Sequence, residues 1–119
     1  MPKYILLLHE TPGDFAHLSP EQMQAIVEKY SAWLGGLQAA GRMAGGEKLK
    51  DDGGLHLRRA DRTTGQLAIQ DGPYSETKEV LGGYFLIEAA GRDEAVEIAR
   101  GCPHLENGWI ELREIDPTA

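Results

Sequence analysis

Residues 71–79 combine a tight turn with a dense run of ionisable and hydroxyl side chains. They read Asp-Gly-Pro-Tyr-Ser-Glu-Thr-Lys-Glu, and an apolar segment, Gly-Gly-Tyr-Phe-Leu-Ile-Glu, follows at 82–88. Gly72-Pro73 is typical of a turn, and an aspartate before such a turn can bond to the backbone two residues on. One interpretation is therefore architectural, with Asp71 as a turn residue and a solvated helical turn after it.

The other interpretation is a pocket rim that binds or transforms a small molecule. Asp71 would serve as an acid, a base or a hydrogen-bond acceptor. Lys78 would meet an anionic group, Tyr74 would stack or donate, and Thr77 would add a hydroxyl. These roles predict a ligand site for a small polar or anionic molecule near the loop from Asp71 to Lys78.

Two histidines extend this hypothesis to acid–base chemistry. His9 ends an apolar run, and His104 follows Cys102 and Pro103 in a loop. Strand ends and loops gather at one edge of an open sheet, so we expect both to reach a common pocket, where either could act as a general base. The alternative is that each is a capping or surface histidine. Cys102 is either a nucleophile with His104 as its base or, more simply, a small buried side chain.

Neither a metal nor a cofactor is expected from the sequence. The four histidines and one cysteine show no spacing typical of a metal site. The glycine pairs at 45–46 and 82–83 flank expected strands and do not open helices, so they do not form a phosphate-binding loop.

The composition indicates one acidic domain spanning residues 1–119. The formal net charge is −7, and the basic residues are scattered. Nucleic acids and anionic membrane surfaces both require a basic face, so neither is an expected partner. The longest apolar runs are too short for a membrane span or a secretory signal, and we therefore expect a cytoplasmic protein.

Residue patterns predict two helices and six strands. Ser19 is a good N-cap, Pro20 a good first helical residue and Gln22 the partner in a capping box; the helix should end at Gly41. Gly35 and Gly36 are interpreted as permitting close packing against the sheet. The second helix is expected at 92–100, and the strands at 3–8, 42–49, 55–59, 66–70, 83–89 and 109–115.

This order predicts an α+β fold, a ferredoxin-like βαββαβ unit with an inserted hairpin at 55–70. Two helices cover only one face of such a sheet, yet the strands at 3–8 and 83–89 carry apolar residues on both faces. Exposing several large side chains would forfeit about 1.5–3 kcal/mol each. We therefore expect a homodimer that packs sheet against sheet. The alternative is that the inserted hairpin folds over and covers the second face.

The sequence resembles the YCII-related proteins, often called DGPF-domain proteins, over nearly its whole length. The likeness is strongest at Asp71–Glu88 and includes Lys3–Leu7, Leu37–Gly41, Gly46–Leu49, Gly101–Leu105 and Ile110–Arg113. The resemblance implies a dimeric α+β barrel with an activity that is mostly unassigned. Some relatives are associated with alternative sigma factors, which suggests an accessory regulatory role as a further alternative.

Two departures from the family pattern are visible. Tyr74 stands where phenylalanine is usual, which adds a hydroxyl group. Shorter family members carry a histidine and an aspartate on the first helix as a proposed catalytic pair, and those positions fall at Tyr30 and Ala39. The family's proposed pair is therefore not transferred to this chain.

Overall fold

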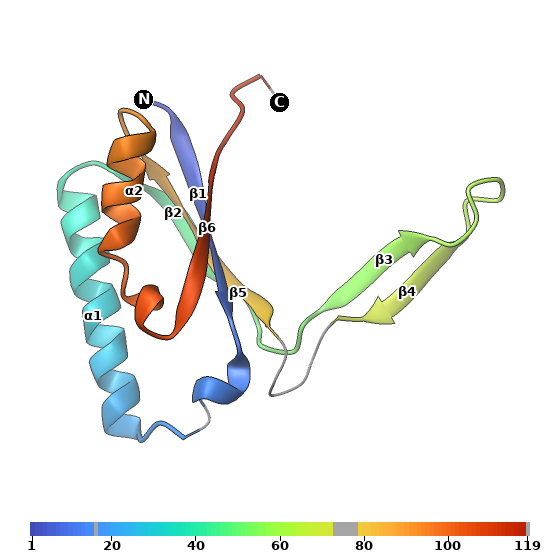
Figure 1. Cartoon of the computed structure of the whole chain (residues 1–119), viewed down its shortest axis with the longest axis horizontal. Helices are drawn as coiled ribbons and strands as arrows, with labels where there is room; N and C mark the ends of the chain where they lie inside the picture. Colours follow the sequence, from blue (N-terminus) through green and yellow to red (C-terminus); the bar gives the residue numbers. More distant parts are fainter. Residues whose placement is uncertain (16, 73–78, 119) are drawn as a thin grey trace.

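The fold combines two antiparallel sheets with two α-helices, in a computed structural model that describes residues 1–15, 17–72 and 79–118 (Figure 1). None of its helices, within those ranges, is long and apolar enough to cross a membrane. In chain order the elements are β1 (Lys3–Glu10), the short 3-10 helix η1 (Pro12–Phe15), α1 (Pro20–Ala39), β2 (Met43–Lys48), β3 (Leu55–Arg59), β4 (Leu67–Asp71), β5 (Val80–Glu88), α2 (Arg92–Arg100), the 3-10 helix η2 (Pro103–Glu106) and β6 (Gly108–Glu114).

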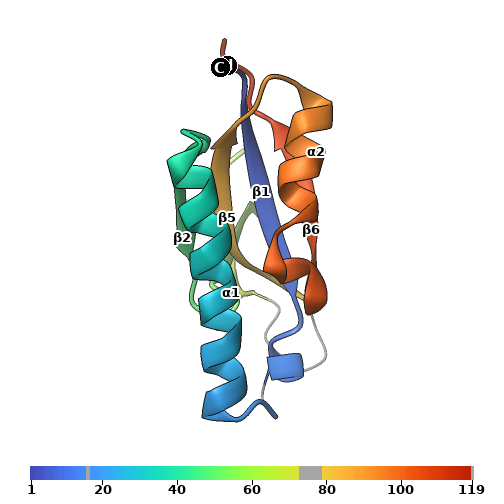
Figure 2. The same ribbon diagram turned by 90° about the vertical axis from the view of Figure 1, so that its left-hand side faces the viewer.

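The main sheet has the strand order β2-β5-β1-β6, with every neighbouring pair antiparallel. Both helices lie on one face of this sheet, as Figure 2 shows. The arrangement is compatible with a ferredoxin-like α+β fold, with β3 and β4 inserted between its second and third strands. The pairing of β2 with β5 has a register irregularity between Met43 and Gly45.

Alternation along β1 divides its side chains between the two faces of the sheet. Tyr4, Leu6 and Leu8 are buried beneath the helices. Ile5 and Leu7 point to the opposite face and are only half-buried. The core on the helix side is completed by residues from α1, α2 and β5, chiefly Leu37, Ile87, Ala89, Ala95 and Ala99.

The start of α1 follows the sequence prediction in detail. Ser19 caps the helix by accepting a hydrogen bond from the Gln22 backbone N–H, and the Gln22 side chain accepts one from the Ser19 backbone N–H. The interpretation of Gly35 and Gly36 was wrong, because a Cβ atom added at either position would meet nothing within 4 Å. Both lie on the exposed side of the helix and not against the sheet.

Strands β3 and β4 form a separate two-stranded arm, defined here as residues 55–71. The arm projects away from the sheet on the side opposite the helices (Figure 1). It raises the radius of gyration to 16.9 Å, where a compact chain of this length would have about 13.5 Å. The alternative in which this hairpin covers the second face of the sheet is therefore wrong for the single chain.

Candidate functional site

A cavity of about 510 Å³ lies between the N-terminal half of α1 and the ends of β1, β2 and β5. Its walls are mainly apolar and include Phe15, Met23, Val27, Leu34 and Phe85. Its polar lining includes Glu10, Tyr30, Lys48 and His104, and Ser31, Glu47 and Asp51 also lie on its wall. Small-molecule sites are typically apolar hollows with a few convergent polar groups, so this cavity is the strongest candidate among the described residues.

His104 is the one buried charged or polar residue of the described chain, with 4% of its surface exposed. Its Nε2 atom lies 2.8 Å from the backbone carbonyl oxygen of His9, and its Nδ1 atom 3.1 Å from the hydroxyl oxygen of Tyr30. A carbonyl oxygen only accepts, so Nε2 carries the hydrogen. In the neutral ring Nδ1 then accepts from Tyr30, and both ring nitrogens are satisfied.

The buried hydroxyl of Tyr30 acts as a hydrogen-bond donor and not as a base. Burial is the main cause that raises its pKa, and the nearby Cys102, Glu10 and Glu106 add to the shift. The phenol therefore stays protonated at any physiological pH. Its oxygen has lone pairs left over after donating to His104, so it can still accept a hydrogen bond from a molecule in the cavity.

Glu10 ends β1 on the helix side of the sheet, and its side chain is only 11% exposed. Burial raises the pKa of this carboxyl and the nearby Asp51 adds to the rise, while the charge of Lys48, and that of His104 when its ring is protonated, oppose it. A carboxyl with a raised pKa exchanges its proton closer to neutral pH than an ordinary glutamate. Glu10 can therefore act as a hydrogen-bond donor, an acceptor or a proton shuttle.

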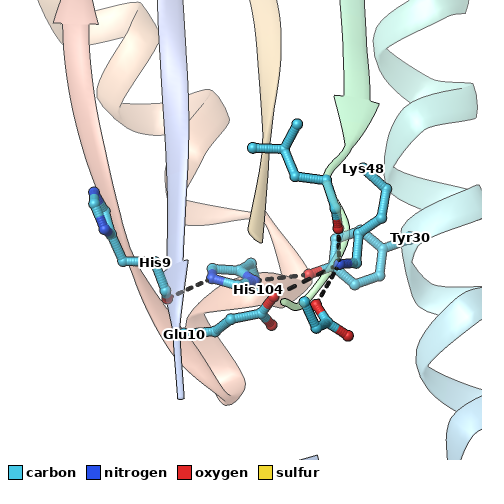
Figure 3. A network of polar contacts seen from close by, with 7 residues as sticks. His9, Glu10, Tyr30, Lys48 and His104 are labelled. Atoms are coloured by element: carbon cyan, nitrogen blue, oxygen red, sulfur yellow. Dashed lines mark hydrogen bonds and ion pairs between the residues drawn. The ribbon is translucent and has the colours of Figure 1, made fainter. Parts of the chain in front are cut away.

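Lys48 supplies the positive charge at this end of the cavity. Its Nζ lies 3.9 Å from Glu10 and 2.7 Å from Asp51, and it also bonds to the Leu49 carbonyl. Figure 3 shows Glu10 and Lys48 at the ends of β1 and β2, beside His104 of η2 and Tyr30 from the middle of α1. These four residues, called the polar cluster below, combine a cation, a carboxyl, a hydroxyl and an imidazole.

The structure does not bring the side chains of His9 and His104 together. The ring of His9 lies on the opposite face of the sheet, stacked on Trp109 with ring centroids 4.1 Å apart and paired with Glu111 at 3.2 Å. Only the backbone carbonyl of His9 reaches His104 (Figure 3). The expectation of a common pocket was wrong for His9, because alternation along β1 sends its side chain away from the helices.

Asp71 lies at the exposed end of β4, opposite Leu55, and does not line the cavity. Gly72 follows in close contact with Gly53 and Gly54, where an added Cβ would collide with the backbone. This part of the motif holds the base of the arm together. Tyr74, Thr77 and Lys78 lie outside the described residues, so their predicted roles in ligand binding stay predictions.

Cys102 is buried, and burial raises the pKa of its thiol. A raised pKa keeps the thiol protonated, which disfavours a nucleophile and favours the interpretation as a small buried side chain. Within the described ranges, no three histidine, cysteine or acidic residues come together as candidate metal ligands.

Sequence reasoning missed Glu10, Lys48 and the contact between Tyr30 and His104. A signal for Glu10 was present in the alternation of β1. Glu10 is two residues after Leu8 and so falls on the same face as Tyr4, Leu6 and Leu8, the helix side of the sheet. Tyr30 was considered only as the position where shorter family members carry a histidine. Its contact joins positions 74 residues apart, which no local pattern could reveal.

The fold and the cavity define an α+β domain with one helix-covered sheet face and a polar cluster beside an apolar hollow. The sequence matches the model of the YCII-related domain over residues 2–119, and the chain therefore belongs to the YCII-related family. It is also 38% identical over 55 residues to an uncharacterized protein of Rhizobium meliloti (strain 1021). That match covers 44% of this chain and 44% of the relative, less than half of either.

Proposed function

We propose that this protein binds a small molecule with an apolar body and a polar or anionic head in the cavity between α1 and the sheet. The observation that carries the proposal is the position of the polar cluster beside otherwise apolar walls. An apolar body would pack on Phe15, Val27 and Phe85, and the head would meet Glu10 and Lys48. Such a division of contacts is how small-molecule sites combine affinity with orientation.

Two groups of the cluster can receive an anionic head, although the carboxyl groups of Glu47 and Asp51 also line the cavity and Asp51 pairs with Lys48 at 2.7 Å. Lys48 offers an ammonium group, and Glu10, with its raised pKa, can offer a proton in place of a negative charge. A carboxylate head could then accept hydrogen bonds from both groups. Binding would keep Glu10 protonated, so affinity for an anion should increase as the pH falls.

A thermal-shift screen tests this proposal with aromatic and short-chain carboxylates, alcohols, amides and amines as probes. A compound at a hundredfold excess over its Kd stabilises the folded state by about 2.7 kcal/mol. We expect compounds that raise the Tm of the wild type and raise it less in Glu10→Gln. The same compounds should leave the Tm of Val27→Trp unchanged, because the indole ring would occupy space at the cavity wall.

The matched control for the charge change is Glu97→Gln, since Glu97 is 69% exposed on α2 and lies outside the cavity. It should leave every hit unchanged. Asp71→Ala tests the sequence prediction that the loop from Asp71 to Lys78 contributes to the ligand site. If no compound binds any variant, the pocket proposal fails, and an accessory regulatory role through protein contacts becomes the better hypothesis.

One observation favours a second candidate, a cofactor-free acid–base enzyme. Carboxyl groups in hollows with a perturbed pKa are often catalytic, and burial raises the pKa of Glu10. Glu10 would exchange the proton, while His104 would position the hydroxyl of Tyr30. Incubating each hit with wild type and Glu10→Gln, followed by mass spectrometry, distinguishes the candidates, because a binder returns its ligand unchanged.

The proposal includes a homodimer formed through the sheet face that carries Ile5, Leu7, Tyr84 and Leu86. These side chains lie opposite the helices and are half-buried in the single chain. A two-fold partner packing sheet against sheet would cover them and give the dimeric α+β barrel expected from the family resemblance. This face is called the open face below.

A further inference from the structure

The arm has one apolar face and one polar face. In the β3–β4 ladder Leu57 lies opposite Ile69, and Leu67 lies opposite Arg59. Because directly opposed residues of antiparallel strands share a face, Leu55, Leu57, Leu67 and Ile69 all lie on one side of the hairpin, with Arg59 and Asp71 at its two ends. The other side carries His56, Arg58, Ala68 and Gln70. Such alternation is typical of a strand pair that covers something with its apolar side.

None of the described residues covers this apolar face. Leu55, Leu57, Leu67 and Ile69 are 62%, 58%, 52% and 60% exposed. An isolated two-stranded hairpin is marginally stable at best in water, and it needs a third strand or another packed surface to persist. Four aliphatic side chains grouped on a projecting hairpin therefore mark an interaction surface.

The charge of the arm differs in sign from that of the rest of the protein. Arg58, Arg59 and Arg62 outweigh Asp61 and Asp71, which gives the arm a formal charge of +1. Because the whole chain carries −7, the remaining residues carry −8. A basic arm on an acidic body is complementary to the body of a second copy of the same chain.

The direction of the arm also supports a second copy of the chain as its partner. The arm leaves the sheet on the side opposite the helices, which is the side of the open face (Figures 1 and 2). A second copy packed on the open face would lie alongside the arm. We infer that the apolar face of the arm docks onto the body of the partner copy, so that the two chains exchange arms across the dimer. This inference rests on the proposed homodimer.

The test uses the full chain and two variants matched in register. Leu57→Ser with Ile69→Ser removes an opposed pair from the apolar face, and His56→Ser with Gln70→Ser alters an opposed pair on the polar face. Light scattering over a dilution series gives the dimer Kd, and hydrogen exchange of peptides from 55–71 reports arm protection. We expect Leu57→Ser with Ile69→Ser to raise the dimer Kd by more than about tenfold, and His56→Ser with Gln70→Ser to raise it by less than about threefold. In the wild type, protection of the arm from hydrogen exchange should disappear on dilution.

The outcomes separate the arm from the dimer. A dimer that keeps its Kd in Leu57→Ser with Ile69→Ser, with arm exchange independent of concentration, overturns the arm inference and leaves the dimer through the open face intact. A wild type that stays monomeric at every concentration overturns both. Circular dichroism shows whether the sheet and helices remain folded, as expected because the arm residues lie outside the hydrophobic core.

Discussion

The Nε2 atom of His104 lies 2.8 Å from the backbone carbonyl oxygen of His9, so the two histidines meet through one ring and one peptide group. This contact ties the 3-10 helix η2 to the end of β1. It also fixes the neutral tautomer of His104, because the carbonyl can only accept. The orientation of the Tyr30 hydroxyl at the cavity is a direct consequence of that tautomer.

Removing the hydroxyl of Tyr30 should destabilise the fold. In Tyr30→Phe the Nδ1 acceptor of the buried His104 loses its donor, and an unsatisfied buried group costs about 1–3 kcal/mol. Urea unfolding measures the loss. Tyr4→Phe is the matched control, because the Tyr4 hydroxyl bonds to Glu114, an exposed residue that water can solvate instead. Equal losses in both variants would contradict a special role for the Tyr30–His104 pair.

Two glycine substitutions should have opposite effects on stability. In Gly108→Ala the new methyl group would meet the His9 carbonyl oxygen and the Nε2 of His104, and overpacking of this kind costs about 1–3 kcal/mol. In Gly35→Ala the methyl group meets nothing, and the exchange inside a helix should stabilise by about 0.5–1 kcal/mol. Thermal unfolding of the two variants checks both signs, and a stabilised Gly108→Ala would refute the close contact.

The raised pKa of Glu10 predicts a pH-dependent stability difference between wild type and Glu10→Gln. The folded state holds the Glu10 proton above the ordinary pKa of 4.5, where the unfolded state has released it. Stability contributed by the protonated group is therefore complete below that value and is lost as the pH rises through the folded-state pKa. Glu10→Gln cannot ionise, so its stability relative to wild type should increase from acidic to neutral pH.

Free energies of unfolding measured across this range for both proteins give the difference directly. Glu97→Gln provides the control, because the Glu97 side chain is 69% exposed and lies outside the cavity. A carbon NMR titration of the Glu10 carboxyl is an independent readout. A Glu10 that titrates at its ordinary value would remove the support for acid–base chemistry at the polar cluster.

A charge on the open face should prevent dimer formation without unfolding the chain. Leu7 lies in the centre of the sheet, opposite Tyr84 on β5 and Glu111 on β6. In Leu7→Lys an ammonium would have to be buried between two sheets, at a cost of several kcal/mol. Light scattering should then report a monomer. Val96→Lys, on the helix side and 38% exposed, is the control that should remain dimeric.

Local patterns predicted the elements well because their causes are local. The capping residues Ser19 and Gln22 fixed the start of α1, and continuous apolar runs indicated that β1 and β5 would present apolar side chains to both faces. Pairing of the strands at 55–59 and 66–70 followed from turn residues between them. The same patterns could not show that this hairpin stands away from the sheet, because they do not specify contacts between distant residues, such as that of Gly72 with Gly53 and Gly54 at its base.

The sequence by itself determined the family, the order of the elements and the two-faced character of the central strands, since each depends on residues adjacent in the chain or on a simple period of two. Only the tertiary structure decided which ionisable groups meet. Glu10, Tyr30, Lys48 and His104 come from four separate segments, and the cavity that they line exists only when α1 packs across the sheet. Burial then sets the pKa of Glu10, and burial is a property of the whole fold.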